Sequence, residues 1–562
     1  MSAAASRPAA STPDIRGLLR DAADAARRLV EDATASVRER ISDGAGRIDR
    51  TLAEGREQHA VHGLAWWGAY AEVMGCVSDW IDTLASEGRG GEAEVLLAQI
   101  LVAEYAAQMI GGVPMNQGEI VRPGHLGLSW AHVRARFGER LIASLEHAGS
   151  QVARSRLVHI LEQGRARPTF EDAGLDDVLD MVREQFHAFG AERIAPHAHG
   201  WHLSDELIPL SVVDDLASLG LFGLTIPEVY GGAAMGKVAM CVVSEELSRG
   251  YLGVGSLATR SEIAGELILT SGTAEQKRAW LPRIASGEVL PTAVFTEPSA
   301  GSDLGSLQTR AVLAGEHYHV SGAKTWITHA ARADLMTLLV RTDPHSRDHR
   351  GLSMLLAAKT RADETSMFPD AGLTGSEIPA IGYRGMREYE LAFDAFHVPR
   401  ENLLGGGEGQ GFKQLMATFE SARIQTAARA IGVAQCALDH ALAYAAQRRQ
   451  FGARLADFPR VQNKLAMMAA EIAGVRQLTY AAARRKDDGK RCDLEAGMAK
   501  LLAARVAWAA ADNALQVHGG NGFAVEYPIS RILADARILN IFEGAGEIQA
   551  QVIGRRLFDL RN

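Results

Sequence analysis

The sequence LPTAVFTEPSAGSD, residues 290–303, marks the point where the chain changes character. Its first six residues are mostly apolar or β-branched, which is typical of a short strand, and the rest are mainly turn formers and hydroxyl-bearing residues. Similar apolar runs follow at residues 318–320, 335–341 and 389–393, each between clusters of Gly, Asp and Ser. The sequence therefore predicts a β segment over residues 291–405.

Helical periodicity dominates on both sides of this segment. Residues 14–164 show apolar positions at three- and four-residue spacing, with no strand pattern between them, and residues 172–287 and 409 onward are also helical in pattern. We expect an α+β protein that is mainly α, in four parts: a helical N-terminal region (1–170), a second helical domain (171–290), a β domain (291–405) and a C-terminal helical bundle (406–562).

Composition excludes several classes of protein. The 562 residues are 47% hydrophobic and 23% charged, which is typical of a folded globular chain and not of a disordered one. The net charge of −9 offers no broad basic surface for nucleic acid or an anionic membrane. The N-terminus lacks a signal-peptide pattern, and we see no apolar span of membrane length. The four scattered cysteines fit buried apolar positions and no metal site. We expect a cytoplasmic protein.

Eight short motifs carry a resemblance to a known family. In chain order they are GLFGLTIPEVYGG (220–232), TEPSAGSD (296–303), GAKTWIT (322–328), GYRG (382–385), VPRENLLG (398–405), RRQFG (448–452), QVHGGNGF (516–523) and IFEGAGEIQ (541–549). Together they resemble the acyl-CoA dehydrogenase family from about residue 172 to the end. The resemblance implies an N-terminal helical domain, a middle β-barrel-like domain and a C-terminal four-helix bundle, here preceded by an extra helical N-terminal region.

The resemblance also implies the reaction, an FAD-dependent α,β-dehydrogenation of an acyl-CoA. Glu543 falls on the position of the family's catalytic base, which removes the α proton while the β hydride passes to flavin N5. Such a base needs a raised pKa, and the neighbouring Ile541 and Phe542 would desolvate it. Gly544 would let the backbone approach the thioester, whose oxygen accepts from the N–H of residue 543 and a flavin hydroxyl.

The remaining site residues are carried over from the same resemblance. Phe295, Thr296, Trp326 and Thr328 would flank the isoalloxazine, with the threonines near N5 and O4, and strand alternation would place Trp326 and Thr328 on one face. Ser302 would meet the flavin phosphate or the CoA side. The FAD of a neighbouring subunit would contact Arg448, Gln450 and Phe451, and its adenosine half Gln516, Gly519, Gly520 and Gly522. This arrangement predicts a homodimer or homotetramer, with electron-transferring flavoprotein as the electron acceptor.

Three charged residues bear on the substrate. Glu420 and Arg423 fall where the family contacts the CoA arm, although a solvated i to i+3 ion pair explains them too. Arg260 lies in an atypical segment at the acyl end of the pocket, where an unpaired buried guanidinium would reject alkyl chains and favour a carboxylate.

We therefore expect a short branched dicarboxylic acyl-CoA as the substrate. The alternative for Arg260 is a surface pair with Glu262 or Glu266. For the whole protein, the alternatives are a short- or branched-chain monocarboxylic enzyme, a glutaryl-type enzyme, or a non-catalytic scaffold built on the helical extension.

Overall fold

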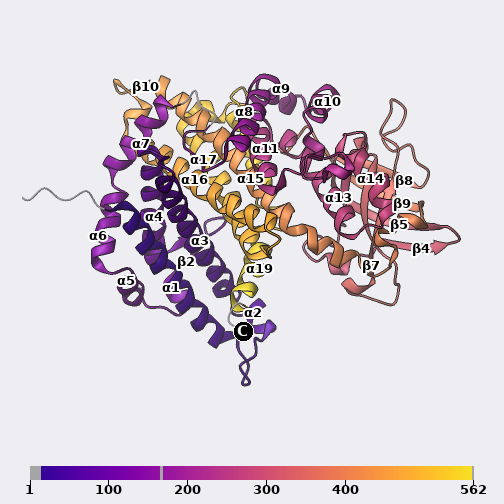
Figure 1. Cartoon of the computed structure of the whole chain (residues 1–562), viewed down its shortest axis with the longest axis horizontal. Coiled ribbons are helices and arrows are strands. Elements are labelled where there is room, and N and C mark those ends of the chain that lie inside the picture. The colour runs from indigo at the N-terminus through magenta and orange to yellow at the C-terminus, as the bar shows by residue number, and fades with distance from the viewer. Residues whose placement is uncertain (1–13, 165–168, 560–562) are drawn as a thin grey trace, which may run out of the picture. The chain divides into compact units, whose positions relative to one another are not determined.

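The computed structural model describes residues 14–164 and 169–559, and the chain forms two compact units (Figure 1). Unit 1 contains the described residues up to 174 together with 445–478 and 553–559. Unit 2 contains residues 175–444 and 479–552. The boundary between the two units does not fall at one point in the sequence, because residues 445–478 and 553–559 fold with the N-terminal region.

Unit 1 is almost entirely helical. Its elements are α1 (Ile15–Ile41), α2 (Arg50–Glu54), α3 (Gln58–Ser86), α4 (Glu92–Gly111), α5 (Trp130–Phe137), α6 (Glu139–Ala148), α7 (Gln151–Gln163), the hairpin β10 (Arg449–Gln450) and β11 (Ala453–Arg454), the first part of α16 (Pro459–Asp487) and the end of α19 (Gly546–Asp559). Asp14 caps α1 by accepting from the Gly17 amide at 3.2 Å. Leu18, Ala22 and Leu29 are buried along one face of α1, which confirms the predicted helical period there.

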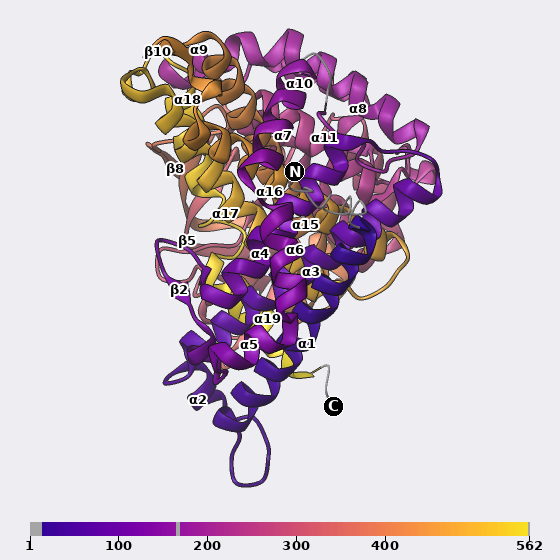
Figure 2. The ribbon, with the colours of Figure 1, turned by 90° about the vertical axis from the view of Figure 1, so that its left-hand side faces the viewer.

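Helix α4 forms the centre of unit 1. It packs against α1, α3, α6 and α7, and Figure 2 shows it running beside α1 and α3. It is also the one helix of the described residues that is long and apolar enough to cross a membrane by length and composition. Two-thirds of its apolar window is buried inside the protein, as expected for a core helix.

A small hairpin in unit 1 departs from the sequence prediction. Strands β1 (Val113–Pro114) and β2 (Ile120–Val121) pair antiparallel immediately after α4, where we expected only helices. Gly112 opens the hairpin with φ 152°, and any side chain there would clash with Ile120. Strands of two residues are too short to leave a period in the sequence.

Unit 2 opens with the helices that precede the sheet. These are α8 (Asp177–Phe189), α9 (Ala195–Leu203), α10 (Leu210–Ser218), α11 (Gly236–Gly250), α12 (Leu252–Gly255), α13 (Leu257–Ser271) and α14 (Ala274–Ala285). A single π-helical segment, Gly190–Ile194, joins α8 to α9. The second set of helices follows the sheet and comprises α15 (Gly411–Gln447), the end of α16, α17 (Asp493–His518), α18 (Ile529–Ile538) and the start of α19.

Seven strands form the curled sheet of unit 2. They are β3 (Pro291–Val294), β4 (Arg310–Ala314), β5 (His317–Thr328), β6 (Leu335–Arg341), β7 (Leu352–Ala358), β8 (Leu373–Ile378) and β9 (Glu388–Pro399). The order is β3-β6-β4-β5-β9-β8, with β7 pairing β6. β3 and β4 each run parallel to β6, and the other pairs are antiparallel.

Both faces of the sheet are buried near its centre. Along β6, Met336 and Leu338 point into the core enclosed by the sheet. Leu335 and Leu339, on the opposite face, pack against Ile263 of α13 and other residues of α13 and α14. A near-continuous apolar run such as β6 is typical of a strand covered on both sides. This packing fixes α13 against the sheet, which matters because α13 carries Arg260.

Candidate active site around Glu543

Glu543 lies in the loop between α18 and α19, in a conformation that needs external support. Its φ is 52°, in the left-handed region, and Gly544 follows with φ 89°. Two side chains hold the carbonyl groups of this turn. Lys500 Nζ donates to the Gly544 carbonyl at 2.6 Å, and Gln549 Nε2 donates to the Glu543 carbonyl at 3.2 Å. Lys500 and Gln549 are fully buried, so the loop is pinned from the interior.

The Glu543 carboxylate is surrounded by donors from two helices. Arg429 Nη2 lies 2.6 Å from Oε2, and the Thr426 hydroxyl donates to the same oxygen. These two residues sit one turn apart on α15 and therefore share a face. Arg260 Nη2, from α13, lies 3.4 Å from Oε1. The Arg429 side chain is 0% exposed and that of Glu543 is 13% exposed, so this is a desolvated ion pair.

This arrangement corrects the expected electrostatics of the base. Burial raises the pKa of Glu543, but the Arg429 and Arg260 guanidinium groups outweigh it, so the pKa lies below its usual value. The expectation of a raised pKa was wrong because the apolar neighbours do not isolate the carboxylate. Ile541 is 51% exposed, and the Phe542 ring lies under the Arg429 guanidinium at 5.0 Å.

A second buried carboxylate lies behind Arg260. Arg260 Nη2 is 3.5 Å from the Thr328 hydroxyl oxygen, and that hydroxyl donates to Glu388 Oε1 at 2.8 Å and reaches Oε2 at 3.1 Å. Burial raises the pKa of Glu388 to about 7. A chain of polar contacts thus runs from Glu543 through Arg260 and Thr328 to Glu388.

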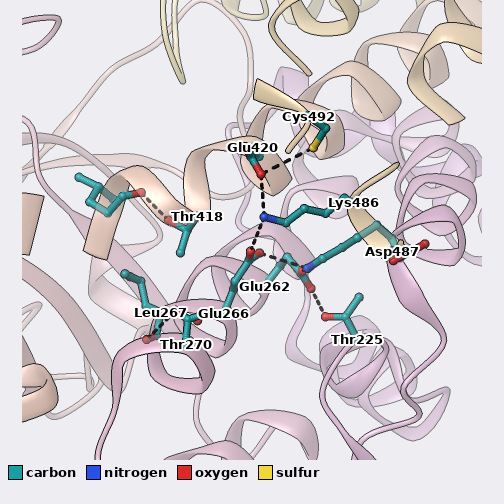
Figure 3. Close-up of polar contacts among 12 residues, drawn as sticks. Thr225, Glu262, Glu266, Leu267, Thr270, Thr418, Glu420, Lys486, Asp487 and Cys492 are labelled. Atoms are coloured by element: carbon teal, nitrogen blue, oxygen red, sulfur yellow. Dashed lines mark hydrogen bonds and ion pairs between the residues drawn. The ribbon is translucent and has the colours of Figure 1, made fainter. Parts of the chain in front are cut away.

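The opposite face of α13 explains why Arg260 is available to this chain. Glu262 and Glu266 form ion pairs with Lys237. Glu266 also lies 3.4 Å from Lys486 Nζ (Figure 3). Both carboxylates are therefore committed to lysines. The surface pair of Arg260 with Glu262 or Glu266, the alternative left open by spacing, does not form.

The same view shows the surroundings of Glu420 (Figure 3). Lys486 Nζ lies 2.9 Å from Glu420 Oε2, and Cys492 Sγ lies 3.6 Å from the same oxygen. The guanidinium of Arg423 instead lies over the Phe419 ring at 5.6 Å. Within the described residues, Glu420 is thus paired with Lys486, and the solvated pair with Arg423 is not the arrangement found.

The flavin-side residues expected on β5 follow an irregularity in the strand. A register shift between Lys324 and Ile327 and a φ of 57° at Trp326 interrupt the alternation of the strand. Trp326 is 55% exposed, whereas Thr328 is buried. The regular alternation from which the same-face expectation was drawn does not hold through this part of β5. Phe295 and Thr296 are half-buried directly after β3, and the Thr296 carbonyl accepts from the Thr325 amide at 3.0 Å.

The other expected cofactor residues are mostly at the surface. In unit 2, Ser302, Gln516, Gly519 and Gly520 are exposed, and Gly522 is buried. Gly519 and Gly520 have open space where a side chain would stand. Arg448, Gln450 and Phe451 belong to unit 1, on or beside the exposed β10–β11 hairpin, and Phe451 is 97% exposed.

Family models cover unit 2 from its first helix onward. The N-terminal, middle and C-terminal domain models of acyl-CoA dehydrogenase match residues 176–288, 292–396 and 409–558. The chain belongs to the acyl-CoA dehydrogenase family. It is an FAD-dependent enzyme of that family. Its helical extension lies ahead of the matched domains, as expected.

Individual relatives agree with this assignment. The (2S)-methylsuccinyl-CoA dehydrogenase of Cereibacter sphaeroides is 60% identical over 514 residues, which is 92% of this chain and 93% of that protein. A match of this length necessarily includes much of the helical extension. The structure of a glutaryl-coenzyme A dehydrogenase–glutaryl-CoA complex is 32% identical, with a TM-score of 0.65, covering 69% of this chain and 97% of that one. A structure described as the electron transferring flavoprotein of Acidaminococcus fermentans is 33% identical, with a TM-score of 0.65, covering 70% and 100%.

The acyl-CoA dehydrogenase site contains residues that sequence reasoning missed. Arg429 and Thr426 lie in the Ala-rich part of α15, Lys500 lies in a similar part of α17, and Glu388 begins β9. Arg429 and Lys500 could have been identified from the sequence, because a lone Arg or Lys among alanines in a core helix is rarely buried without a partner. Glu388 gave no such signal. Glu547, four residues after the base, is exposed in the first turn of α19.

Proposed function

We propose that this acyl-CoA dehydrogenase oxidises a short branched dicarboxylic acyl-CoA, and specifically that it converts (2S)-methylsuccinyl-CoA to mesaconyl-CoA. The observation that carries the proposal is the pair of buried guanidinium groups beside the base, Arg429 at 2.6 Å and Arg260 at 3.4 Å from the Glu543 carboxylate. The 60% identity to a protein named for this substrate supports the same conclusion.

The charge balance of the site favours a substrate that brings its own carboxylate. Two guanidinium groups face the one carboxylate that must act as the base, and leaving a buried charge unpaired costs several kcal/mol. Glu388 offsets this excess only partly, because burial raises its pKa to about 7. A terminal substrate carboxylate would complete the pairing, whereas an alkyl chain would leave the cations uncompensated.

Glu543 is the residue we assign to removal of the α proton. Arg429, Arg260 and Thr426 keep its carboxylate ionised and fixed in direction. A substrate carboxylate that shares the guanidinium groups would weaken their hold on Glu543 and so raise its basicity when substrate is bound. Lys500 and Gln549 would keep the Glu543 and Gly544 backbone in place beside the thioester oxygen.

The donor set near β3 and β5 fits a flavin. When bound, FAD accepts the β hydrogen with its two electrons. As expected from the sequence, we assign the contacts to the flavin ring and phosphates to Phe295, Thr296, Ser302, Trp326 and Thr328. We assign the contacts to the adenosine and pyrophosphate half, across a subunit boundary, to Arg448, Gln450, Phe451, Gln516, Gly519, Gly520 and Gly522. Among the described residues, the buried Thr259 Oγ1 and Ser261 Oγ have no hydrogen-bond partner, which fits a polar ligand in this region.

The proposed function also implies an electron acceptor, an oligomeric state and a location in the cell. We assign electron-transferring flavoprotein as the electron acceptor, and the likeness to the structure from Acidaminococcus fermentans supports this. We further propose a homodimer or homotetramer in the cytoplasm that binds neither nucleic acid nor membrane, with Glu420 and Arg423 on the CoA arm. We also propose that the chain has four functional parts, residues 1–170, 171–290, 291–405 and 406–562.

A panel of thioesters tests the substrate. The purified protein is mixed anaerobically with methylsuccinyl-, succinyl-, glutaryl- and butyryl-CoA, and bleaching of the flavin absorbance is followed. Methylsuccinyl-CoA should bleach the flavin fastest, and butyryl-CoA at least about tenfold more slowly. The likeness to the glutaryl-CoA complex makes a glutaryl-type enzyme the second candidate, and rapid bleaching by glutaryl-CoA with release of CO2 would favour it. Faster bleaching by butyryl-CoA would overturn the dicarboxylate proposal.

A further inference from the structure

Glu388 is a buried carboxylate with an unusual hydrogen-bond environment. It is 7% exposed and lies directly opposite Thr328 in the antiparallel pairing of β9 with β5. Both of its oxygens are reached by the same donor, the Thr328 hydroxyl, at 2.8 and 3.1 Å. An ionised carboxylate can accept from about four donors. The Thr328 hydroxyl contacts both oxygens of Glu388, so the two side chains form a specific pair.

When Glu388 is ionised, the polarity of the Thr328 hydroxyl is fixed. A hydroxyl has one hydrogen and two lone pairs, and the hydrogen points to Glu388. Arg260 Nη2 approaches the same oxygen at 3.5 Å, where it can only donate. The strand itself is held by Thr292, whose hydroxyl donates to the Thr328 carbonyl at 2.6 Å. Any further partner of the Thr328 side chain therefore meets a lone pair.

We propose that Glu388 acts through Thr328 as a positioning residue that shifts the bound flavin toward its reduced form. N5 of an oxidised flavin can only accept a hydrogen bond, whereas N5–H of a reduced flavin donates one. A Thr328 oxygen that offers a lone pair matches the reduced flavin and not the oxidised one. The inference rests on the placement of Thr328 at N5 given under the proposed function.

The charges around Glu388 determine the conditions for a test. Arg260 of α13 faces it with a positive charge and Glu543 of the α18–α19 loop with a negative one, and burial raises its pKa to about 7. At pH 8.5 Glu388 is therefore mainly ionised. Its negative charge also opposes the addition of electrons through space, so a single substitution mixes two opposite effects. A double-mutant cycle separates them, because the through-space effect does not depend on the Thr328 hydroxyl.

The experiment measures the flavin midpoint potential at pH 8.5, by anaerobic equilibration with reference dyes and without any acyl-CoA. Four holoproteins are compared: wild type, Glu388→Met, Thr328→Val and the double variant. We expect Glu388→Met to disfavour the reduced flavin more in the presence of Thr328 than in its absence, by about tenfold in the equilibrium constant, or about 30 mV for this two-electron couple. The sign of this coupling is the diagnostic result.

Glu388→Gln is the matched control, because its amide oxygen can still accept from Thr328 while the charge is lost. It should raise the potential and show little coupling to Thr328→Val, and Glu388→Leu takes the place of Glu388→Met if the methionine variant does not fold. Additive effects of Glu388→Met and Thr328→Val would overturn the inference, as would equal coupling for Met and Gln. A Thr328→Val variant with unchanged potential and flavin spectrum would show that Thr328 does not face N5, which also overturns it. The substrate proposal is tested separately by the thioester panel, so its failure leaves these potentials interpretable.

Discussion

Replacing Arg429 with Met should convert a dicarboxylate-selective site into an unselective one. The substitution preserves most of the side-chain length and removes a guanidinium that is 0% exposed and 2.6 Å from Glu543. A hydrogen bond to a charged group contributes about 1.5–3 kcal/mol. At about 1.4 kcal/mol per tenfold, kcat/KM for methylsuccinyl-CoA should fall about 10- to 150-fold. Butyryl-CoA has no carboxylate to lose, so its kcat/KM should fall only by the part that comes from the weakened hold on Glu543, which both thioesters share.

The pH dependence of this variant gives a second, independent sign. Arg429 lowers the pKa of Glu543, and a base must be deprotonated to act. Removing Arg429 takes away the largest of the influences that lower this pKa. The acid limb of the kcat/KM profile should therefore move to higher pH in Arg429→Met. An unchanged acid limb would mean that residue 543 is not the group that titrates in catalysis.

Arg249→Met is the matched control for Arg429→Met. Arg249 is also a largely buried arginine of unit 2, with Nε 2.6 Å from Asp439 Oδ2, and the Glu543 carboxylate is not among its partners in the described contacts. Both variants should lose stability in urea unfolding, because each removes the guanidinium nearest to a carboxylate that is at least partly buried. Only Arg429→Met should change the ratio of the two kcat/KM values. Equal losses for both thioesters in Arg429→Met would refute the reasoning, since they would indicate general disruption.

Three further substitutions test other parts of the site. Glu543→Gln should retain FAD and the native circular dichroism spectrum but lose at least about a thousandfold in turnover, and near-normal activity would place the base elsewhere. Arg260→Ala should raise KM for methylsuccinyl-CoA far more than for butyryl-CoA in steady-state assays. Equal increases in the two KM values would show that Arg260 does not bind the substrate carboxylate. Lys500→Met tests whether the protonation of Lys500 is coupled to folding. Burial lowers the pKa of Lys500 to about 7, so above that pH the unfolded chain binds more protons than the folded chain. The free energy of unfolding of the wild type, measured in urea, should therefore increase relative to that of the variant between pH 7 and 9. A constant difference across that range would show that Lys500 does not titrate there.

The helices and the central strands were predictable because their signals are local. The helical pattern predicted from residue 409 onward is found in α15, α16 and α17. The β6 range was predicted in full, since an apolar run covered on both faces leaves a continuous signal. Strands β4, β7 and β8 were missed. The alternation in β8 is between polar residues, which hides the strand. β4 (RAVLA) is apolar but short and mostly exposed. β7 (LSMLLAA) is a buried apolar run like β6 and was overlooked.

The position of the base was predictable, but its electrostatics were not. Glu543 could be identified from the motif around it, whereas Arg429 and Arg260 approach it from 114 and 283 residues away in the sequence. Local reasoning considered only Ile541 and Phe542 and therefore gave the wrong direction for the pKa of Glu543. Trp326 shows the same limit, since a bulge set by pairing with β9 cannot be read from the β5 sequence alone.

A crystal structure of the Glu543→Gln holoenzyme with methylsuccinyl-CoA would test where the substrate carboxylate binds. Our account predicts that its oxygens lie about 2.7–2.9 Å from guanidinium nitrogens of Arg260 and Arg429, with the side chain of residue 543 beside the α carbon. A substrate carboxylate directed to solvent or to other residues, with both arginines still turned toward position 543, would contradict it.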